Sequence, residues 1–394
     1  MFKRFIEYCF CIIVLSSCNF GFSYEEFINR DSNLHFESPE HLIIGSEIML
    51  HSSSGELIRS DYYDVLNLKL NDGNNLGVSF AELVYLGGDF IGDPNQQIGG
   101  LDEVSSEQAF LKNFNVVYST QFKNYLPEIT RLVNEQIRIN YHNIEHGQTL
   151  FIPDDLNRKF NCATGGGCNV IDWLFNQGLY LKLANVNFDH FGHDAVDAYL
   201  AGHRLALKMA LLARDSKNQG LLNKAYAYEA FAHHFLTDLS ASGHIRTPRK
   251  DIARWCSNTP YTISLDLANV MHKADNERGL YITDMSGESW FAYGDAEIFI
   301  DKNDESLKRL IIKMQKSTDQ IYDVYKGKIR FDEAYNASKK FLPDLDKISN
   351  DKRNAHALFK MKNGKLVEYN QKTNSYNEVS NCLFSLIKYK IYGY

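Results

Sequence analysis

The chain has 394 residues, of which 44% are apolar and 23% are charged, and this composition excludes a disordered or collagen-like protein. The 49 acidic residues outnumber the 42 basic ones, so the formal charge of −7 argues against a nucleic-acid binder that relies on overall positive charge. The length predicts one large domain or two smaller ones.

The first residues are typical of a secretory signal peptide. Lys3 and Arg4 precede an apolar stretch over 5–15, and small residues up to Ser23 follow it. We therefore predict a signal peptide at 1–23 and an exported protein, either extracellular or periplasmic. An alternative is a lipoprotein, because Leu-Ser-Ser before Cys18 resembles a lipidation box. No later apolar run is long enough to predict a transmembrane helix.

Helical periodicity dominates the middle of the chain, whereas 24–100 gives mixed signals. Apolar residues recur at steps of three and four over Asp194–Ala213 and Leu222–Leu239, which are also rich in Ala and Leu, so we expect two buried helices there. Further helices are predicted within 101–140, over 306–325 and over 331–341. The fold class is therefore predicted to be mainly α.

Four cysteines remain beyond the signal segment, an even number that suits an oxidising compartment. Cys162 and Cys168 enclose Ala-Thr-Gly-Gly-Gly, a flexible loop, so we predict a local disulfide between them. A phosphate-binding glycine loop is the alternative, but the Gly-Lys-Ser/Thr ending that it requires is missing.

The tail changes character. Asn363-Gly364 lies between two alternating runs within Ala357–Tyr369 and predicts a β-hairpin. The aromatic and basic stretch Leu383–Tyr394 is interpreted as an edge strand, with membrane contact as the alternative. We expect a β-rich extension at 346–394 after a helical domain at 24–345.

Histidines concentrate in one segment, since seven of the 13 lie between residues 190 and 272. His234 and Asp238 are four residues apart on a predicted helix, so both side chains leave the same face and can bind one ion. His244 follows six residues later, after a Gly that is expected to end the helix. The pair alone is a weak signal, but an otherwise apolar helix must satisfy these polar groups, and a metal ion does so well.

This pattern resembles the zinc-dependent phospholipases C, which share an all-helical fold with the zinc single-strand nucleases. Their signature is a helical His-x-x-x-Asp with a further His six residues on, as at His234, Asp238 and His244. The resemblance covers about residues 41 to 295. Its closer likeness, through Gly243–Arg249 and Phe291–Asp295, is to a secreted branch found in Pseudomonas and Legionella.

The resemblance implies two or three bound Zn²⁺ ions and a ligand set. Its members here would be His41, Asp89, His190, His234, Asp238, His244, His272 and Asp275. Asp89 would be a ligand or the general base, and Asp238 would bridge ions and share in catalysis. Arg246 and Arg249 are candidates for phosphate binding, with a purely structural role as the alternative.

Two departures from the family pattern leave ligands open. The family has a Glu four residues after the later His, where this chain has Asn276, so Asp275 is taken as the substitute, with Asn276 and Glu277 as alternatives. The family's third zinc uses the mature N-terminal amine, which stands at a different spacing here and would be blocked by lipidation.

The remaining histidines have simpler interpretations. His203 and His233 are expected to be hydrogen-bonded core residues, and His193 with Asp197 imitates the ligand pair without a family counterpart. His35 and His51 flank His41 and are its alternatives, whereas His142, His146 and His356 are interpreted as surface residues.

The expected function is that of an exported phospholipase C, a monomer that cleaves glycerophospholipids, above all phosphatidylcholine, in membranes or micelles and that binds no nucleic acid. Two alternatives stay open: a zinc nuclease or nucleotidase on the same fold, and an exported lipid-binding protein without catalysis. The many Tyr and Phe residues suit both lipid contact and base stacking.

Overall fold

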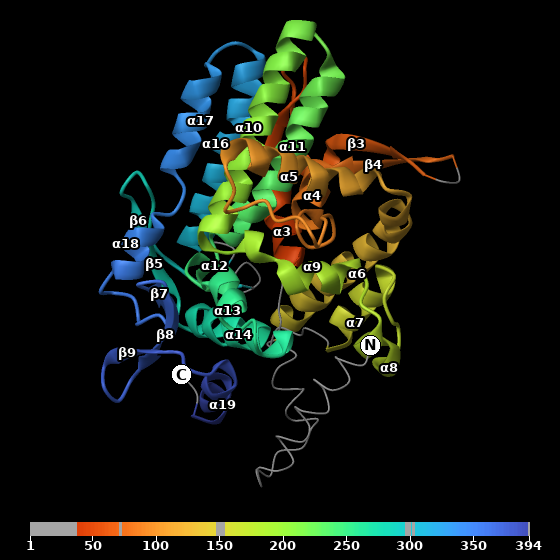
Figure 1. Ribbon diagram of the computed structural model, residues 1–394. Helices are drawn as coiled ribbons and strands as arrows, with labels where there is room; N and C mark the ends of the chain where they lie inside the picture. The colour runs from red at the N-terminus through yellow and green to blue at the C-terminus, as the bar shows by residue number, and fades with distance from the viewer. Residues whose placement is uncertain (1–37, 71–72, 147–153, 296–300, 302–303, 393–394) are drawn as a thin grey trace.

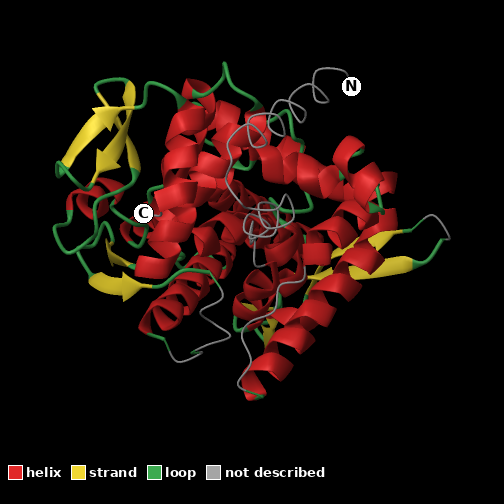
Figure 2. Cartoon of the chain, turned by 90° about the horizontal axis from the view of Figure 1, so that it is seen from below, coloured by secondary structure: helices red, strands yellow, loops and turns green. Residues whose placement is uncertain are grey.

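The computed structural model describes residues 38–70, 73–146, 154–295, 301 and 304–392 (Figure 1). The predicted signal segment 1–23 and His35 lie outside these residues. The described part is mainly helical with small antiparallel sheets, most of them at the rim of the helical body (Figure 2), which confirms the predicted fold class. Across the described residues, no helix is both long and apolar enough to span a bilayer.

Two long adjacent helices, α10 (Gly192–Ser216) and α11 (Gln219–Asp238), form the centre of the molecule (Figure 1). They confirm the two helices predicted from the Ala-rich segments. Small residues let them approach closely: a Cβ on Gly202 would lie 2.3 Å from the Phe110 ring and 2.6 Å from the Ala232 methyl. The last turn of α11 is thereby fixed in the interior, where His234 and Asp238 project.

The N-terminal part surrounds this pair with short elements. They are α3 (Ser38–Ser46), β1 (Met49–His51), β2 (Leu57–Arg59), β3 (Asp64–Lys69), β4 (Asn75–Ser79) and α4 (Phe80–Leu86). Ser79 and Glu82 cap α4 reciprocally, because each side chain accepts the other's backbone N–H. Helix α4 packs against α3 and α11 and leads directly into Gly87, Gly88 and Asp89.

A second group of helices follows, with α5 packed on α10. Its members are α5 (Glu103–Phe114), α6 (Thr120–Glu145), α7 (Asp154–Ala163), α8 (Val170–Phe175), α9 (Leu179–Val186) and the 3-10 turn η3 (Phe188–His190). The predicted disulfide between Cys162 and Cys168 is present and closes the loop between α7 and α8. Helices α5 and α6 confirm the helical pattern after residue 101.

After α11 the chain leaves the end of the α10 and α11 pair that carries Asp238, and later helices pack back against α10. The elements are α12 (Ser242–Ile245), α13 (Arg249–Trp255), α14 (Tyr261–Arg278), β5 (Leu280–Thr283), β6 (Ser289–Ala292), α16 (Glu305–Tyr325), α17 (Phe331–Lys340) and α18 (Leu345–Asn350). Helices α16 and α17 match the two helices predicted there, and both contact α10.

The C-terminal part contains the predicted hairpin, β7 (Phe359–Lys362) and β8 (Lys365–Asn370), and adds a third strand, β9 (Ser375–Glu378). Asn363 and Gly364 both have positive φ, 52° and 74°, as the tight turn requires.

The edge strand expected at Leu383–Tyr394 is wrong, because Cys382–Tyr392 forms helix α19. Cys382, Leu386 and Tyr389 are buried at three- and four-residue steps, a helical period that the aromatic and basic composition obscured. A disulfide joins Cys382 to Cys256, so α19 shares a hydrophobic core with α13 and α14.

Candidate metal centre

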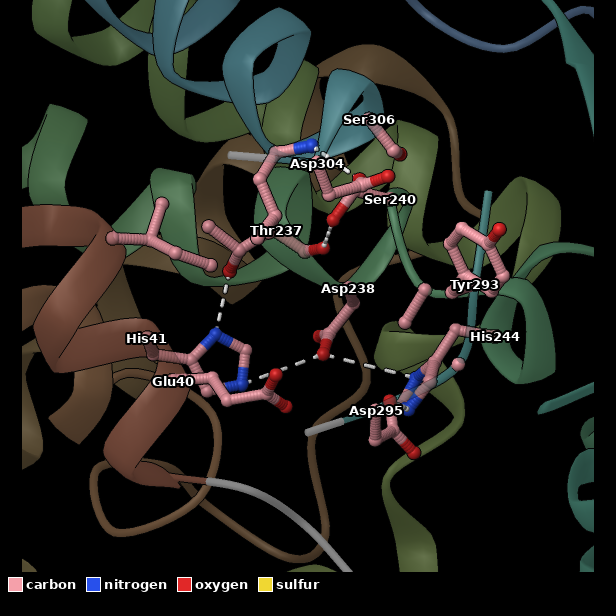
Figure 3. Close-up of a pocket in the computed structure, with 14 residues that line it drawn as sticks. Glu40, His41, Thr237, Asp238, Ser240, His244, Tyr293, Asp295, Asp304 and Ser306 are labelled. Carbon is pink, nitrogen blue, oxygen red and sulfur yellow. Dashed lines mark hydrogen bonds and ion pairs between the residues drawn. The ribbon is translucent and has the colours of Figure 1, made fainter. Parts of the chain in front are cut away.

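The last turn of α11 places His234 and Asp238 side by side, with His234 Nε2 3.7 Å from Asp238 Oδ2. Both side chains are buried. Asp238 lies between two further histidines: its Oδ1 is 3.7 Å from His41 Nε2 on α3 and 3.7 Å from His244 Nδ1 on α12 (Figure 3). Its Oδ2 is 2.9 Å from His190 Nδ1. One carboxylate therefore contacts four imidazoles that come from four separate elements.

Three of these imidazoles are oriented through Nδ1. His41 Nδ1 lies 2.6 Å from the Thr237 hydroxyl, which donates its own hydrogen to the His234 carbonyl, so His41 is the donor in this contact. His234 Nδ1 donates to the Val84 carbonyl at 3.0 Å, and His244 Nδ1 donates to the His190 carbonyl at 3.1 Å. Each Nε2 is then left with a lone pair, as in histidines that bind metals.

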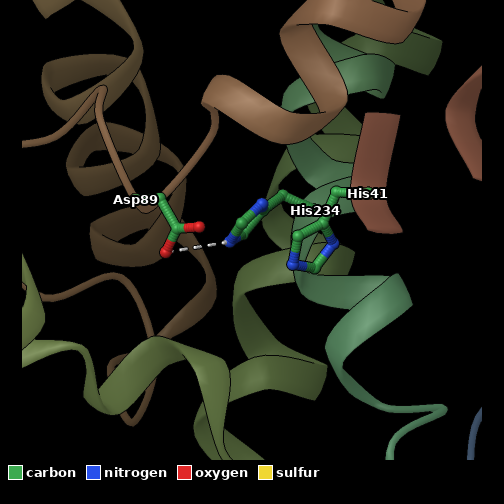
Figure 4. Close-up of side chains that lie close together, drawn as sticks. All are labelled: His41, Asp89 and His234. Carbon is green, nitrogen blue, oxygen red and sulfur yellow. Dashed lines mark ion pairs between the residues drawn. The ribbon is translucent and has the colours of Figure 1, made fainter. Parts of the chain in front are cut away.

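The side chains form three groups that could each hold a metal ion. Within each group one ligand atom per residue lies within 4.8 Å of the others; the groups are His41, Asp89 and His234; His190, His234 and Asp238; and His244, His272 and Asp295. Figure 4 shows the first group, in which the Asp89 carboxylate is 3.9 Å from His234 Nε2. His234 belongs to the first two groups, and the third adjoins them where Asp238 Oδ1 lies 3.7 Å from His244 Nδ1, so the groups are contiguous.

Glycine is required where the chain passes this centre. Gly88 has a φ of +72°, and a Cβ there would lie 2.8 Å from the rings of both His190 and His234. The tight turn after α4 thereby brings Asp89 against His234. The Gly-Gly-Asp sequence is explained by this close approach.

Burial sets the protonation of the centre. It lowers the pKa of His41, His190 and His234 well below the usual value, which keeps these imidazoles neutral and able to donate a lone pair. Burial also raises the pKa of Asp238 to about 8. At Asp295 burial acts in the same direction, but the charges of His272 and His244 outweigh it and hold the pKa below its usual value. A bound cation would stabilise both carboxylates in their ionised form.

A small pocket opens onto this centre (Figure 3). Its lining includes His41, Asp238, His244 and Asp295, together with Glu40, Tyr293 and Asp304. The centre is therefore accessible to a ligand, although its side chains are mostly buried.

The structure brings together seven of the eight predicted ligands, and Asp275 is the exception. Both oxygens of Asp275 accept hydrogen bonds from Arg246, from Nε at 2.8 Å and from Nη2 at 2.7 Å. Asp275 lies outside the three groups, and the expectation that it is a ligand is corrected. Its place beside His272 is taken by Asp295, whose Oδ2 is 3.1 Å from His272 Nε2.

Asp295 is the residue that the sequence analysis did not assign as a ligand. It lies at the end of the Phe291–Asp295 segment that carried part of the resemblance, and this was the only signal that pointed to it. Asn276, one turn after His272, donates from Nδ2 to Asp295 Oδ2 at 2.7 Å. Asn276 therefore lies beside the third group and is hydrogen-bonded to its carboxylate.

The two arginines have structural partners. Arg246 is paired with Asp275, and the buried Arg249 donates to the Ala184 carbonyl at 2.7 Å, with its guanidinium 5.1 Å from the centre of the Phe191 ring. Neither lines the described cavity, so the structural alternative fits both better than phosphate binding.

The other histidines lie apart from the three groups. His203 and His233 are buried against Glu229, as expected of core residues. His51 stacks on Tyr322, and His193 belongs to none of the groups formed by the described residues.

A comparison with models of protein families, with curated proteins and with solved structures finds no match to this chain.

Proposed function

We propose that this chain is an exported zinc-dependent phospholipase C that hydrolyses the phosphodiester of glycerophospholipids. The observation that carries the proposal is the set of three His/Asp groups around His234 and Asp238, at the inner end of an open cavity. Imidazole nitrogen and carboxylate oxygen without thiolate are a donor set that suits Zn²⁺. The resemblance of His234, Asp238 and His244 to the family signature selects the reaction class.

The residues fit a metal because their own hydrogen bonds leave lone pairs that point at one another. The Nε2 atoms of His41 and His234, each left with a lone pair because its Nδ1 is the donor, lie 3.7 Å from the Asp238 carboxylate. His190 Nδ1, 2.9 Å from Asp238 Oδ2 and 3.2 Å from His234 Nε2, is a donor that adjoins both groups. Bringing such groups together in the interior costs free energy unless a cation is present. Zinc bound there would supply a Lewis acid that activates water and stabilises negative charge on a phosphoryl group.

The chain's own residues would do the remaining work. Asp89, at the edge of the first group, would orient the attacking water and take its proton. Asp238, whose carboxylate contacts His41, His190 and His244, would share in holding the metal beside the reacting phosphate. The cavity mouth, open to solvent, would admit the head group.

The cavity lining favours a cationic head group such as choline over a nucleic acid. Glu40, Asp304 and the exposed Tyr293 ring line it, and carboxylates together with an aromatic face suit a quaternary ammonium group. None of the described residues that line it is Lys or Arg, whereas proteins that bind nucleic acid strands need cations along the phosphates. This observation favours phosphatidylcholine as the substrate.

The test joins metal analysis to two assays. The chain from residue 24 onward is purified, its zinc is counted, and phosphatidylcholine and single-stranded DNA are offered separately, with and without a chelator. We expect two or three zinc ions and release of phosphocholine that stops when zinc is removed and returns when it is restored. Zinc-dependent DNA cleavage without lipid hydrolysis would replace the proposal with the nuclease alternative, and absence of both zinc and turnover would leave an exported binding protein.

A further inference from the structure

Helix α8 presents two large apolar side chains to solvent. Ile171 is 70% exposed and Phe175 is 55% exposed, and their four-residue spacing puts them on the same face. Trp173, two residues after Ile171 and so on another face of the helix, is half-buried. Figure 1 places α8 at the outer edge of the molecule, away from the α10 and α11 pair. Within the part of the chain that the structure describes, these two side chains are therefore exposed on a peripheral helix.

The segment that carries α8 contains almost no charge. From Phe160 to Leu181 the only charged residue is Asp172, although 23% of the whole chain is charged and about five charges would be expected in a segment of this length. The Asp172 carboxylate accepts a hydrogen bond from the Asn169 amide at 2.6 Å. Depletion of charge around exposed apolar side chains is a property of surfaces that leave water when they bind.

The exposure does not result from a loose loop. The Cys162–Cys168 disulfide closes one side of the segment, and the buried Asn161 side chain fastens the other. Asn161 Nδ2 donates to the Gly167 carbonyl at 3.0 Å, and its Oδ1 accepts from the Gly178 N–H at 2.6 Å. The backbone thus holds Ile171 and Phe175 outward in a fixed orientation, which limits the entropy lost on binding.

We propose that residues 165–176, the apolar tip, insert into the interface of a zwitterionic phospholipid bilayer, and this inference rests on the proposed function. Two side chains offer far less than the roughly 800 Å² per partner that a stable protein complex buries. They are sufficient for shallow and reversible insertion into a bilayer interface. The absence of Lys and Arg from Phe160–Leu181 indicates a zwitterionic rather than an anionic surface.

The test measures binding of the full zinc-loaded chain to phosphatidylcholine vesicles by flotation. The variant Ile171→Ser with Phe175→Ser is compared with a matched control, Leu212→Ser with Ile312→Ser, whose residues are 54% and 52% exposed on α10 and α16. We expect the tip variant to bind vesicles about tenfold more weakly and the control to bind like the wild type. Equal binding of all three proteins would overturn the proposal, as would an equal loss in the two variants.

A second measurement separates this surface from the catalytic proposal. Monomeric short-chain phosphatidylcholine in solution requires no membrane contact, so the tip variant should hydrolyse it at the wild-type rate while its turnover of vesicles falls about tenfold. If vesicle binding depends on the tip but the protein hydrolyses neither substrate, the proposed phospholipase activity is refuted and the proposed membrane contact of the tip is supported. If the tip instead mediates self-association in solution without vesicle binding, the lipid partner is refuted.

Discussion

Helix α11 contributes to two buried polar clusters that differ in what they need. The first is the candidate metal centre, with His234 and Asp238. The second, the Glu229 cluster, consists of His203, Glu229, His233 and Ser317. Each takes a histidine and a carboxylate from α11 at a four-residue spacing, and His233 and His234 are neighbours in the sequence. A helix turns about 100° per residue, so the two imidazoles face different surroundings.

The difference lies in the supply of hydrogens. Around Glu229 three side chains converge on one carboxylate: His203 Nδ1 at 2.8 Å, His233 Nε2 at 3.0 Å and the Ser317 hydroxyl. In the metal centre the Nδ1 hydrogens of His41, His234 and His244 are given to other acceptors, and their Nε2 atoms face the ligand groups without a hydrogen. The Glu229 carboxylate thus faces donors from its own cluster, although His203 Nε2 and His233 Nδ1 are buried without a hydrogen-bond partner among the described residues. The candidate metal centre instead presents lone pairs and carboxylates, which suit a cation.

The largest effect should come from replacing His234 by Gln, and the same replacement of the neighbouring His233 provides the comparison. His234→Gln should lower turnover at least about a thousandfold, because a loss of about 4 kcal/mol of transition-state stabilisation is expected when a metal site is disrupted. His233→Gln should keep the zinc content and cost about 1–3 kcal/mol of stability, since Glu229 loses a buried partner. Zinc analysis, turnover and urea unfolding of both variants check this.

The contrast between the two clusters would be contradicted if the two variants behaved in the opposite way. If His233→Gln lost zinc while the protein stayed folded, the Glu229 cluster would belong to the metal centre. If His234→Gln retained full zinc and turnover, the three groups would not be the site of the reaction.

Helical spacing predicted only the part of the centre that lies on one element, His234 and Asp238, because that spacing depends on residues close in the chain. His244 was placed by its position six residues beyond Asp238, and the distant His41, Asp89, His190 and His272 were assigned through the family resemblance. The same rule failed at Asp275, which has the right spacing from His272 but is bound by Arg246. Asp295 reaches the centre after the β5–β6 hairpin, and no local period encodes a contact of that kind.

In the fold, too, features encoded by nearby residues were predicted, whereas a feature that depends on distant contacts was missed. The long Ala- and Leu-rich segments were predicted as helices because their period repeats over many residues. Asn363-Gly364 was predicted as a turn because Asn and Gly adopt the positive φ that a two-residue hairpin turn requires. Helix α19 was missed, since its 11 residues give only three turns of pattern and its burial depends on α14 and on the Cys256 disulfide.

A smaller effect concerns acid stability. Burial would raise the pKa of Glu229, but its interactions with His203 and His233 outweigh this and lower the pKa from 4.5 to about 2. A carboxylate with a depressed folded-state pKa stabilises the fold above its unfolded pKa, and this contribution is lost as the pH falls from about 4.5 toward 2. Between pH 5 and pH 3 the loss should be about 2 kcal/mol.

The variant Glu229→Gln isolates this contribution. The difference in the free energy of unfolding between wild type and variant, measured in urea on the zinc-free chain, should shrink as the pH falls from 5 to 3. The exposed Glu378, 2.6 Å from Lys365, provides the control, and Glu378→Gln should change stability little because solvent screens the pair. A difference that stays constant with pH would show that the Glu229 carboxylate is not stabilised in its ionised form.

The smallest effect should be at Asn276, which joins two segments of the metal centre. Its Oδ1 accepts from the Gly243 N–H at 2.7 Å, next to His244, and its Nδ2 donates to Asp295 at 2.7 Å. A Cβ on Gly243 would lie 2.5 Å from Asn276 Oδ1, so the segment is fitted closely around the amide. Asn276 therefore fixes both His244 and Asp295 without being a ligand of the third group.

Removal of this amide should weaken the third group alone. Asn276→Ala should lower the affinity for one zinc ion about 10- to 100-fold, as loss of a hydrogen bond to a ligand typically does, while the other zinc stays bound. Competition with a chromophoric chelator measures this independently of turnover. Asn134→Ala is the control, since that exposed amide bonds only to Thr130 of its own helix. If Asn276→Ala bound all its zinc as tightly as this control, Asp295 would be held in place by the fold of the β5–β6 hairpin, and the contrast between the two clusters would rest on the histidines alone.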